Sequence, residues 1–145
     1  MTSIDYLDLI PNRLPYLWVD EVLGVDERSI HTRKFVDPKL ELFAGHYPNF
    51  PVFPGALQCE CAFQASAILI AYLGVSTREK IPVVARANEL KFKRMVRPGD
   101  MLDVHVQLEN RMKDVFFLKG RILRDGEATT TLNFVTTAAS PEPVN

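Results

Sequence analysis

The most constraining feature of this chain is an apolar run from Ala56 to Leu73, ALQCECAFQASAILIAYL, in which Glu60 is the only charged side chain. A pattern that is apolar on all sides predicts a buried helix, not an amphipathic surface helix. Burial of a lone carboxylate is costly, so such an acid either has a partner or takes up a proton. The sequence therefore predicts a central helix that carries one acid with a partner or a chemical task.

A proline-rich turn, GHYPNFPVFPG, leads from His46 into this helix. Its three prolines fix their own backbone angles and restrain the residues before them, so we interpret them as sources of rigidity. A lone acid near a lone histidine is the composition of a general acid–base pair. A single histidine is more often structural, however, and Glu60 could instead form a buried ion pair with Arg86 or another basic residue. The residues alone leave these alternatives open.

The bulk composition is that of an ordinary globular protein. The chain has 145 residues, 47% of them hydrophobic and 24% charged, with a formal net charge of -1. We expect one domain over 1–145, with a core over about 7–137 and a loose tail over 138–145. Near-neutrality excludes the broad basic field needed for sequence-independent nucleic-acid binding. The first residues lack a basic and then apolar secretory pattern, which favours the cytoplasm.

Two other interpretations of the apolar run are weaker. Its length is at the short edge for a membrane span, about 20 residues, and its first half is interrupted by Gln58, Glu60 and Gln64, so we favour a core helix. The only cysteines, Cys59 and Cys61, are two positions apart, which points them in different directions on a helix. They are expected to be buried thiols, and no metal site is predicted.

The remaining elements are predicted mainly as strands joined by short turns. Helical turns are expected over 3–10 and 38–43, and strands over 17–25, 30–36, 83–96, 101–108, 116–123 and 128–137. Alternation places Leu102 and Val104 on one face of the 101–108 strand and His105 on the other. No helices separate the later strands, so the class is α+β, with one antiparallel sheet around a single helix. Such a sheet leaves an edge that favours a dimer.

At this point the residues resemble a known family. The stretch GHYPNFPVFPGALQCECAFQ is similar to the signature of the beta-hydroxyacyl-acyl-carrier-protein dehydratases of bacterial fatty acid synthesis, the FabZ-type branch of the hot-dog fold. IPNRLPYLWVDEV, LKFKRMVRPGDML and FLKGRILRDGEATTTLNFV are similar to other segments of that family. The resemblance covers about 7–137.

The resemblance implies a hydro-lyase that removes water from a (3R)-3-hydroxyacyl thioester on acyl carrier protein and gives the trans-2-enoyl thioester, without a cofactor. His46 matches the family's base at C2, and Glu60 matches the acid that protonates the leaving hydroxyl. The family forms each site between two subunits of a homodimer, and three dimers often form a hexamer. Gly55, at the start of the helix, is expected to offer its N–H to the thioester carbonyl.

Further residues are expected to support the site or line an acyl tunnel. They are Gln64, Tyr47, Phe50, Phe53, Phe63, Val83 and Arg86. A basic cluster could be a solvated strand face or a docking patch for the acidic carrier protein, and it comprises Lys91, Lys93, Arg94 and Arg97. Phe50, Phe53, Val83 and Arg86 depart from the family's usual residues near the acyl path. They predict an acyl preference that differs from that of ordinary straight-chain fatty acid synthesis, for example for a secondary-pathway or polyketide-like substrate.

Two other functions remain possible. In a hot-dog thioesterase, Glu60 would activate water to hydrolyse the thioester, although hydrolysis gives His46 no evident role. A non-catalytic dimeric module would hold a carrier protein or an acyl chain, although both candidate catalytic residues are present in the sequence.

Overall fold

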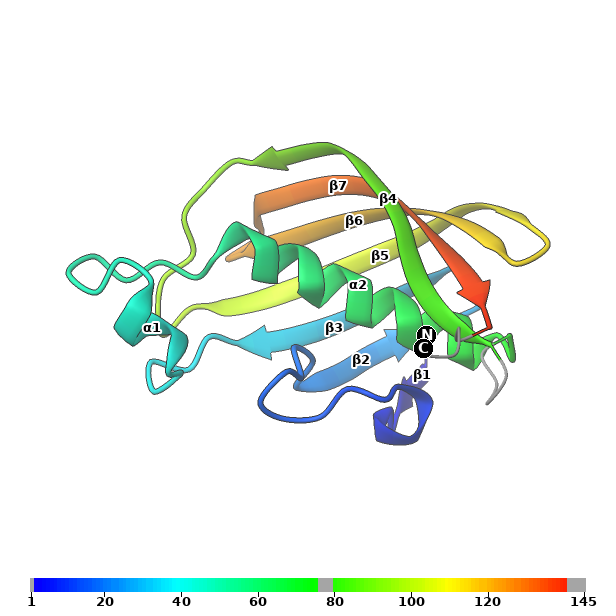
Figure 1. Ribbon diagram of the computed structural model, residues 1–145, viewed down its shortest axis with the longest axis horizontal. Helices are drawn as coiled ribbons and strands as arrows, with labels where there is room; N and C mark the ends of the chain where they lie inside the picture. Colours follow the sequence, from blue (N-terminus) through cyan, green and yellow to red (C-terminus); the bar gives the residue numbers. More distant parts are fainter. Residues whose placement is uncertain (1, 76–79, 141–145) are drawn as a thin grey trace, which may run out of the picture.

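One long helix lies across a single antiparallel sheet (Figure 1). The computed structural model describes residues 2–75 and 80–140. The seven strands of the sheet have the order β1-β2-β3-β5-β6-β7-β4, and all neighbours are antiparallel. The strands are β1 (Thr2–Ile4), β2 (Glu21–Val25), β3 (Ser29–Phe35), β4 (Ile81–Phe92), β5 (Met101–Met112), β6 (Val115–Arg124) and β7 (Glu127–Ala139). This architecture confirms the predicted α+β class.

The central helix, α2 (Gly55–Tyr72), agrees with the predicted apolar run to within one residue at each end. It packs against strands from both halves of the sheet, and ten of its side chains are buried. Gly120 on β6 permits the close approach, because a Cβ there would lie 3.0 Å from Leu132 Cδ2 and 3.2 Å from Ala62 Cβ. Within the described residues, no helix is long and apolar enough to cross a membrane.

The later strands show the predicted alternation. On β5 the side chains of Leu102, Val104, Val106 and Leu108 are buried against α2, while His105 is on the opposite face. Cys59 and Cys61 are free and buried, as expected. Burial raises the pKa of both thiols, most strongly that of Cys61, so both stay protonated and unreactive near neutral pH.

Several local predictions were wrong at the ends of the chain and in the connections. The predicted helix over 3–10 is instead β1 followed by a short 3-10 helix, η1 (Leu7–Leu9), because β1 pairs with β2 and this pairing overrides the local helical spacing. The predicted turn over 38–43 lies later, in α1 (Leu42–Gly45). Strand β7 includes residues 138 and 139, which the prediction assigned to the tail; residues 141–145 lie outside the described residues.

Candidate active site

Glu60 lies on the side of α2 that the sheet does not cover. Its neighbours Cys59 and Cys61 are buried, whereas Glu60, Phe63 and Ala67 are only half-buried and follow one another at helical spacing. A carboxyl group in this position is partly removed from water but remains open to a ligand on the uncovered side of the helix.

The Glu60 carboxyl is held by two neutral donors. Gln64, one turn further on and 2% exposed, donates from Nε2 to Glu60 Oε2 at 3.1 Å and to Tyr16 O at 3.1 Å. The amide orientation of Gln64 is set by Trp18, whose backbone N–H donates to Gln64 Oε1 at 2.8 Å. The Tyr16 hydroxyl also hydrogen-bonds to Glu60. The acid is therefore fixed by contacts with the segment before β2.

The electrostatic environment of the carboxyl favours its protonated form. Burial raises the pKa of Glu60, and the hydrogen bonds from Gln64 and Tyr16 lower it by less, so the pKa is above its ordinary value. Within residues 2–75 and 80–140 of this chain, Glu60 forms no ion pair with Arg86 or another basic residue. A raised pKa is the property that a carboxyl group needs to act as a general acid.

His46 ends α1 and precedes the proline-rich turn. Its backbone N–H donates to Leu42 O at 3.0 Å, and its ring meets the Tyr47 ring edge-on at 4.7 Å between centroids. Tyr47 has a φ of 52° and is 66% exposed. Since Glu60 contacts Tyr16 and Gln64, the contacts of His46 and Glu60 within one chain do not overlap.

The start of α2 adjoins a pocket of about 510 Å³. Pro54 is the N-cap and Gly55 is the first helical residue, so the Gly55 N–H has no partner within the helix. A Cβ on Gly55 would lie 2.5 Å from Cε1 of Phe92, which shows how closely the ring covers this position. The pocket therefore brings together a helix N-terminus and apolar walls.

The other predicted tunnel residues are dispersed in the structure. Phe53 is buried against Trp18 and lines the pocket at the start of α2, and Phe63 packs on Phe134 at 5.2 Å between ring centroids. Phe50 is 49% exposed. Val83 and Arg86 are exposed on β4, far along that strand from Phe92.

The predicted docking residues are also divided. Lys93 and Arg94 line the pocket at the start of α2, and Arg94 is paired with Glu127 at 2.9 Å. Arg97 lies over the Phe50 ring, with 4.3 Å from its Cζ to the ring centroid, so it belongs to the turn after His46. Lys91 is on β4 opposite Thr131.

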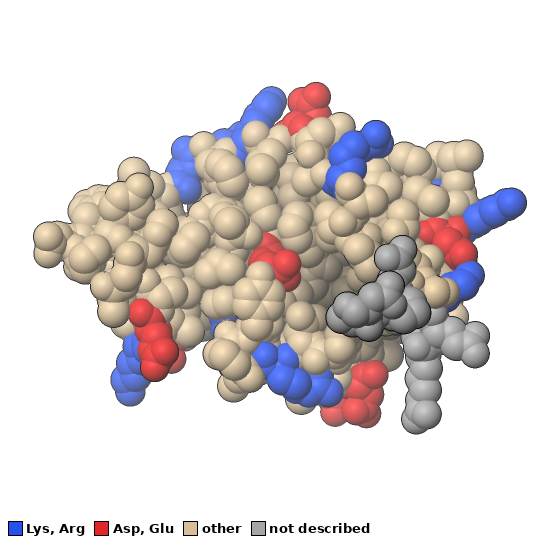
Figure 2. Space-filling view, viewed as in Figure 1, with Lys and Arg blue, Asp and Glu red and all other residues tan. Residues whose placement is uncertain are grey.

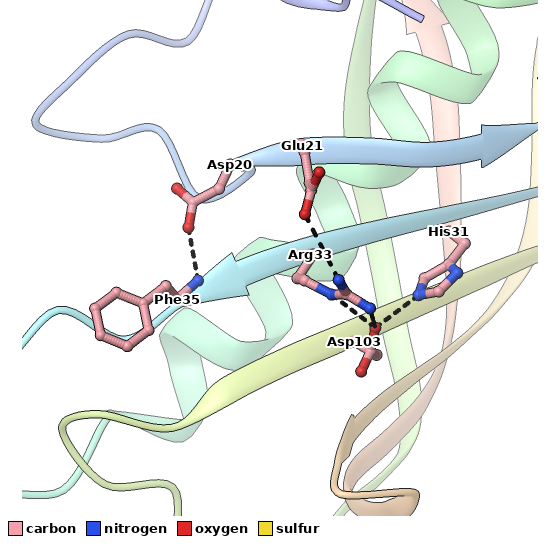
Figure 3. A network of polar contacts seen from close by, with 6 residues as sticks. All are labelled: Asp20, Glu21, His31, Arg33, Phe35 and Asp103. Atoms are coloured by element: carbon pink, nitrogen blue, oxygen red, sulfur yellow. Dashed lines mark hydrogen bonds and ion pairs between the residues drawn. The ribbon is translucent and has the colours of Figure 1, made fainter. Parts of the chain in front are cut away.

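The face of the sheet turned away from α2 carries a separate polar network (Figure 3). His31 Nε2 is 2.8 Å from Asp103 Oδ1, and Arg33 donates to the same oxygen from Nε and Nη2 at 3.2 Å. Burial raises the pKa of Asp103, but these contacts outweigh it and the pKa is lowered. No group of three or more metal-ligating side chains occurs in the described residues. His31 takes part in this polar network, and His105 stacks on the His31 ring.

His105 should make folding stability sensitive to pH. Its ring stacks on His31 at 4.1 Å, and burial, followed by the charges of His31 and Arg121, lowers its pKa. The unfolded chain therefore binds a proton at His105 more readily than the folded protein does. As a result, the free energy of unfolding falls as the pH drops below the pKa of this residue in the unfolded chain, about 6.5. We expect the melting temperature of His105→Gln to fall less between pH 7.5 and 5.5 than that of the unaltered protein. Equal falls would contradict this assignment.

Tyr16 is a contact of the acid that the sequence analysis missed. It is 44 positions before Glu60, and no local spacing connects the two. The signal that could have found it is Gln64, which the sequence predicts as a supporting residue. Its contact with the chain before β2 is visible only in the structure.

Comparisons with known proteins show the family to which this chain is similar. The family model described as ApeI dehydratase matches residues 23–130. The 3-hydroxyacyl-[acyl-carrier-protein] dehydratase FabZ of Rickettsia akari is 35% identical over 131 residues, which cover 90% of this chain and 90% of that protein.

Solved structures share the fold at much lower identity. A chain of the dehydratase heterocomplex ApeI:P from Xenorhabdus doucetiae matches with a TM-score of 0.76 at 15% identity. The match covers 92% of this chain and 89% of that chain. A hypothetical thioesterase from Streptococcus pneumoniae, solved with coenzyme A, matches with a TM-score of 0.68 at 11% identity. The match covers 85% of this chain and 88% of that chain. The two likenesses show a shared hot-dog fold, which by itself does not separate dehydration from hydrolysis.

Proposed function

This chain belongs to the ApeI-like and FabZ-type family of hot-dog dehydratases, and from that membership we propose that it removes water from a 3-hydroxyacyl thioester on acyl carrier protein. The product is the trans-2-enoyl thioester. The observation that carries the proposal is the Glu60 carboxyl, half-buried and held by Gln64 and Tyr16, with no cationic partner among the described side chains.

In the proposed reaction His46 is the base and Glu60 is the acid. The imidazole takes the C2 proton, the C2 electron pair forms the new double bond, and the C3–O bond breaks. The leaving hydroxyl takes the Glu60 proton and departs as water. The hydrogen bonds from Gln64 and Tyr16 then stabilise the carboxylate that forms. Return of the proton from His46 to Glu60, directly or through water, restores both groups.

The amide of Gly55 is proposed to stabilise the thioester oxygen. Negative charge develops on that oxygen as the C2 proton leaves, and an unpaired N–H at the positive end of a helix favours it. The absence of a side chain at Gly55 lets the Phe92 ring lie directly against this position. No metal or organic cofactor is required by this scheme.

A homodimer is part of the proposal. Among the described residues, strand β4 ends the sheet and pairs on one side only, with β7, and the residues from Arg86 to Phe92 are exposed. A long free edge of this kind favours antiparallel pairing with the same strand of a second copy. The face that carries α2 is largely uncharged, with Lys and Arg mostly around its rim (Figure 2). These features support a dimer in which His46 of one subunit serves Glu60 of the other.

The carrier protein is proposed to approach from the start of α2. Lys93 lines the pocket there, and Arg97 lies over Phe50 in the turn that follows His46. Positive charge near the site entrance would speed encounter with an acidic carrier. Lys91 and Arg94 complete the proposed docking group, although the contact with Glu127 reduces the free charge of Arg94.

Product analysis tests the proposal directly. The purified protein is incubated with a 3-hydroxyacyl carrier-protein thioester, and the products are followed by mass. Loss of one water supports the dehydratase. A free acid supports the thioesterase suggested by the shared fold, and bound but unchanged substrate supports a non-catalytic module.

Tyr16→Phe is expected to shift the alkaline limb of the pH–rate profile to higher pH. The Tyr16 hydroxyl lowers the pKa of Glu60, so its removal raises that pKa and keeps the acid protonated to higher pH. The measurement is kcat against pH for both proteins. Tyr72→Phe, at the far end of α2, is the matched control and should leave the profile unchanged. A shift of the limb to lower pH would contradict the assigned contact.

A further inference from the structure

Gln58 is a buried polar residue to which the proposed mechanism gives no role. It lies two positions before Glu60, so its side chain leaves the opposite side of α2 and points into the sheet. It is 3% exposed. Its Oε1 accepts hydrogen bonds from Thr129 Oγ1 at 2.8 Å and Thr130 Oγ1 at 2.7 Å, both on β7.

These contacts use the oxygen of the amide and leave its nitrogen free. Across the part of the chain that the structure describes, Gln58 Nε2 has no hydrogen-bond partner. It is nevertheless not one of the side-chain nitrogen and oxygen atoms that are both fully buried and without a partner. Gln58 also lines the pocket of about 510 Å³ at the start of α2. A buried amide whose two N–H groups have no partner is costly unless a ligand or water accepts them. The nitrogen therefore faces the pocket as a donor.

The rest of the pocket has matching chemistry. Its other polar groups are the first amides of α2 and the cations Lys93 and Arg94, and none of the described side chains lining it is acidic. Apolar walls come from Phe53 and Phe92. Such a pocket suits an apolar chain that carries an oxygen acceptor, because its polar side chains are one amide and two cations.

We propose that Gln58 Nε2 donates to a carbonyl oxygen of the bound thioester, apart from the reacting atoms. This inference rests on the proposed function, which places the thioester carbonyl at Gly55 in the same pocket. Two parts of such a substrate could supply the oxygen: a second carbonyl along the acyl chain, or an amide carbonyl of the pantetheine arm. Gln58 is thus a specificity-determining contact for one of these two carbonyls.

The test compares Gln58→Leu with the unaltered protein on three 3-hydroxyacyl thioesters. They are a saturated chain on pantetheine, a chain of equal length with a second carbonyl on pantetheine, and that oxo chain on a simple alkyl thiol. If the acyl carbonyl is the partner, kcat/KM falls about tenfold on both oxo thioesters and little on the saturated one. If the arm is the partner, kcat/KM falls on both pantetheine thioesters and not on the alkyl one. Equal activity of the two proteins on all three overturns the inference.

Controls separate this contact from folding and from the proposed function. Thr130→Val removes one donor to Oε1 but keeps Nε2, so it should retain the unaltered pattern. Gln58→Glu keeps the acceptor for both threonines and removes the N–H donors, so it should reproduce the losses if Gln58→Leu does not fold. If neither variant folds, the deciding measurement is ligand binding to the unaltered protein. The affinity for a 3-deoxy oxoacyl pantetheine thioester is compared with the affinity for the saturated 3-deoxyacyl thioester of a simple alkyl thiol. If the first affinity is no higher than the second, the inference is overturned. Absence of dehydration with every thioester would instead contradict the proposed function.

Discussion

Glu60→Gln is expected to lower kcat for water elimination by about 10²- to 10⁴-fold, the usual contribution of a positioned general acid. Glutamine has nearly the shape of the protonated acid and can still meet Gln64 and Tyr16, but it has no proton to give to the leaving hydroxyl. Hydroxide leaves poorly without that proton. The measurement is single-turnover formation of the enoyl thioester, which separates chemistry from substrate binding.

The same substitution should not destabilise the fold. The pKa of Glu60 is raised in the folded state. The stability that Glu60 contributes is therefore fully present below the pKa of the unfolded chain, and it is lost as the pH rises through the pKa of the folded protein. A neutral glutamine removes this loss, so the variant should be at least as stable at pH 7. Glu27→Gln, in the exposed turn between β2 and β3, is the matched control and should keep full activity. Near-full activity of Glu60→Gln would show that Glu60 is not the acid.

Features set by local periodicity could be predicted from the sequence. The 56–73 run gave α2, and the alternation from Leu102 to Leu108 gave the buried face of β5, because both follow from the spacing of apolar residues along one element. The N-terminal prediction failed because β1 is a strand only through its pairing with β2, a partner about 20 residues away. Local spacing carries no information about such a partner.

The candidate site divides in the same way. His46, Glu60 and Gly55 were found through one contiguous motif, whereas the contacts that tune the acid connect distant segments. Gln64 reaches Tyr16 across 48 positions, and Gln58 reaches Thr129 across 71. Residue types predict which side chains can do the chemistry, but the pKa of Glu60 and the donor character of the pocket depend on packing between these segments.

Mixing two inactive variants is expected to restore activity. If each site takes His46 from one subunit and Glu60 from the other, a heterodimer of His46→Ala and Glu60→Gln contains one site with both residues intact and one with neither. Random exchange of equal amounts makes half of the dimers heterodimers, so about a quarter of the unaltered activity should return in a two-fold symmetric assembly. Each variant alone should be reduced by about 10²-fold or more.

The reciprocal mixture gives the control for this arrangement. Unaltered protein mixed with the double variant His46→Ala/Glu60→Gln forms heterodimers in which both shared sites lack one residue, so activity should fall below that expected from simple dilution. If both residues of a site came from one chain, the unaltered subunit would remain active in every heterodimer, and the two single variants would not complement. The separate contacts of His46 and Glu60 within one chain favour the shared site, since Tyr47 packs on His46 while Gln64 and Tyr16 hold Glu60. Activity in these two mixtures therefore distinguishes a site shared by two subunits from a site within one.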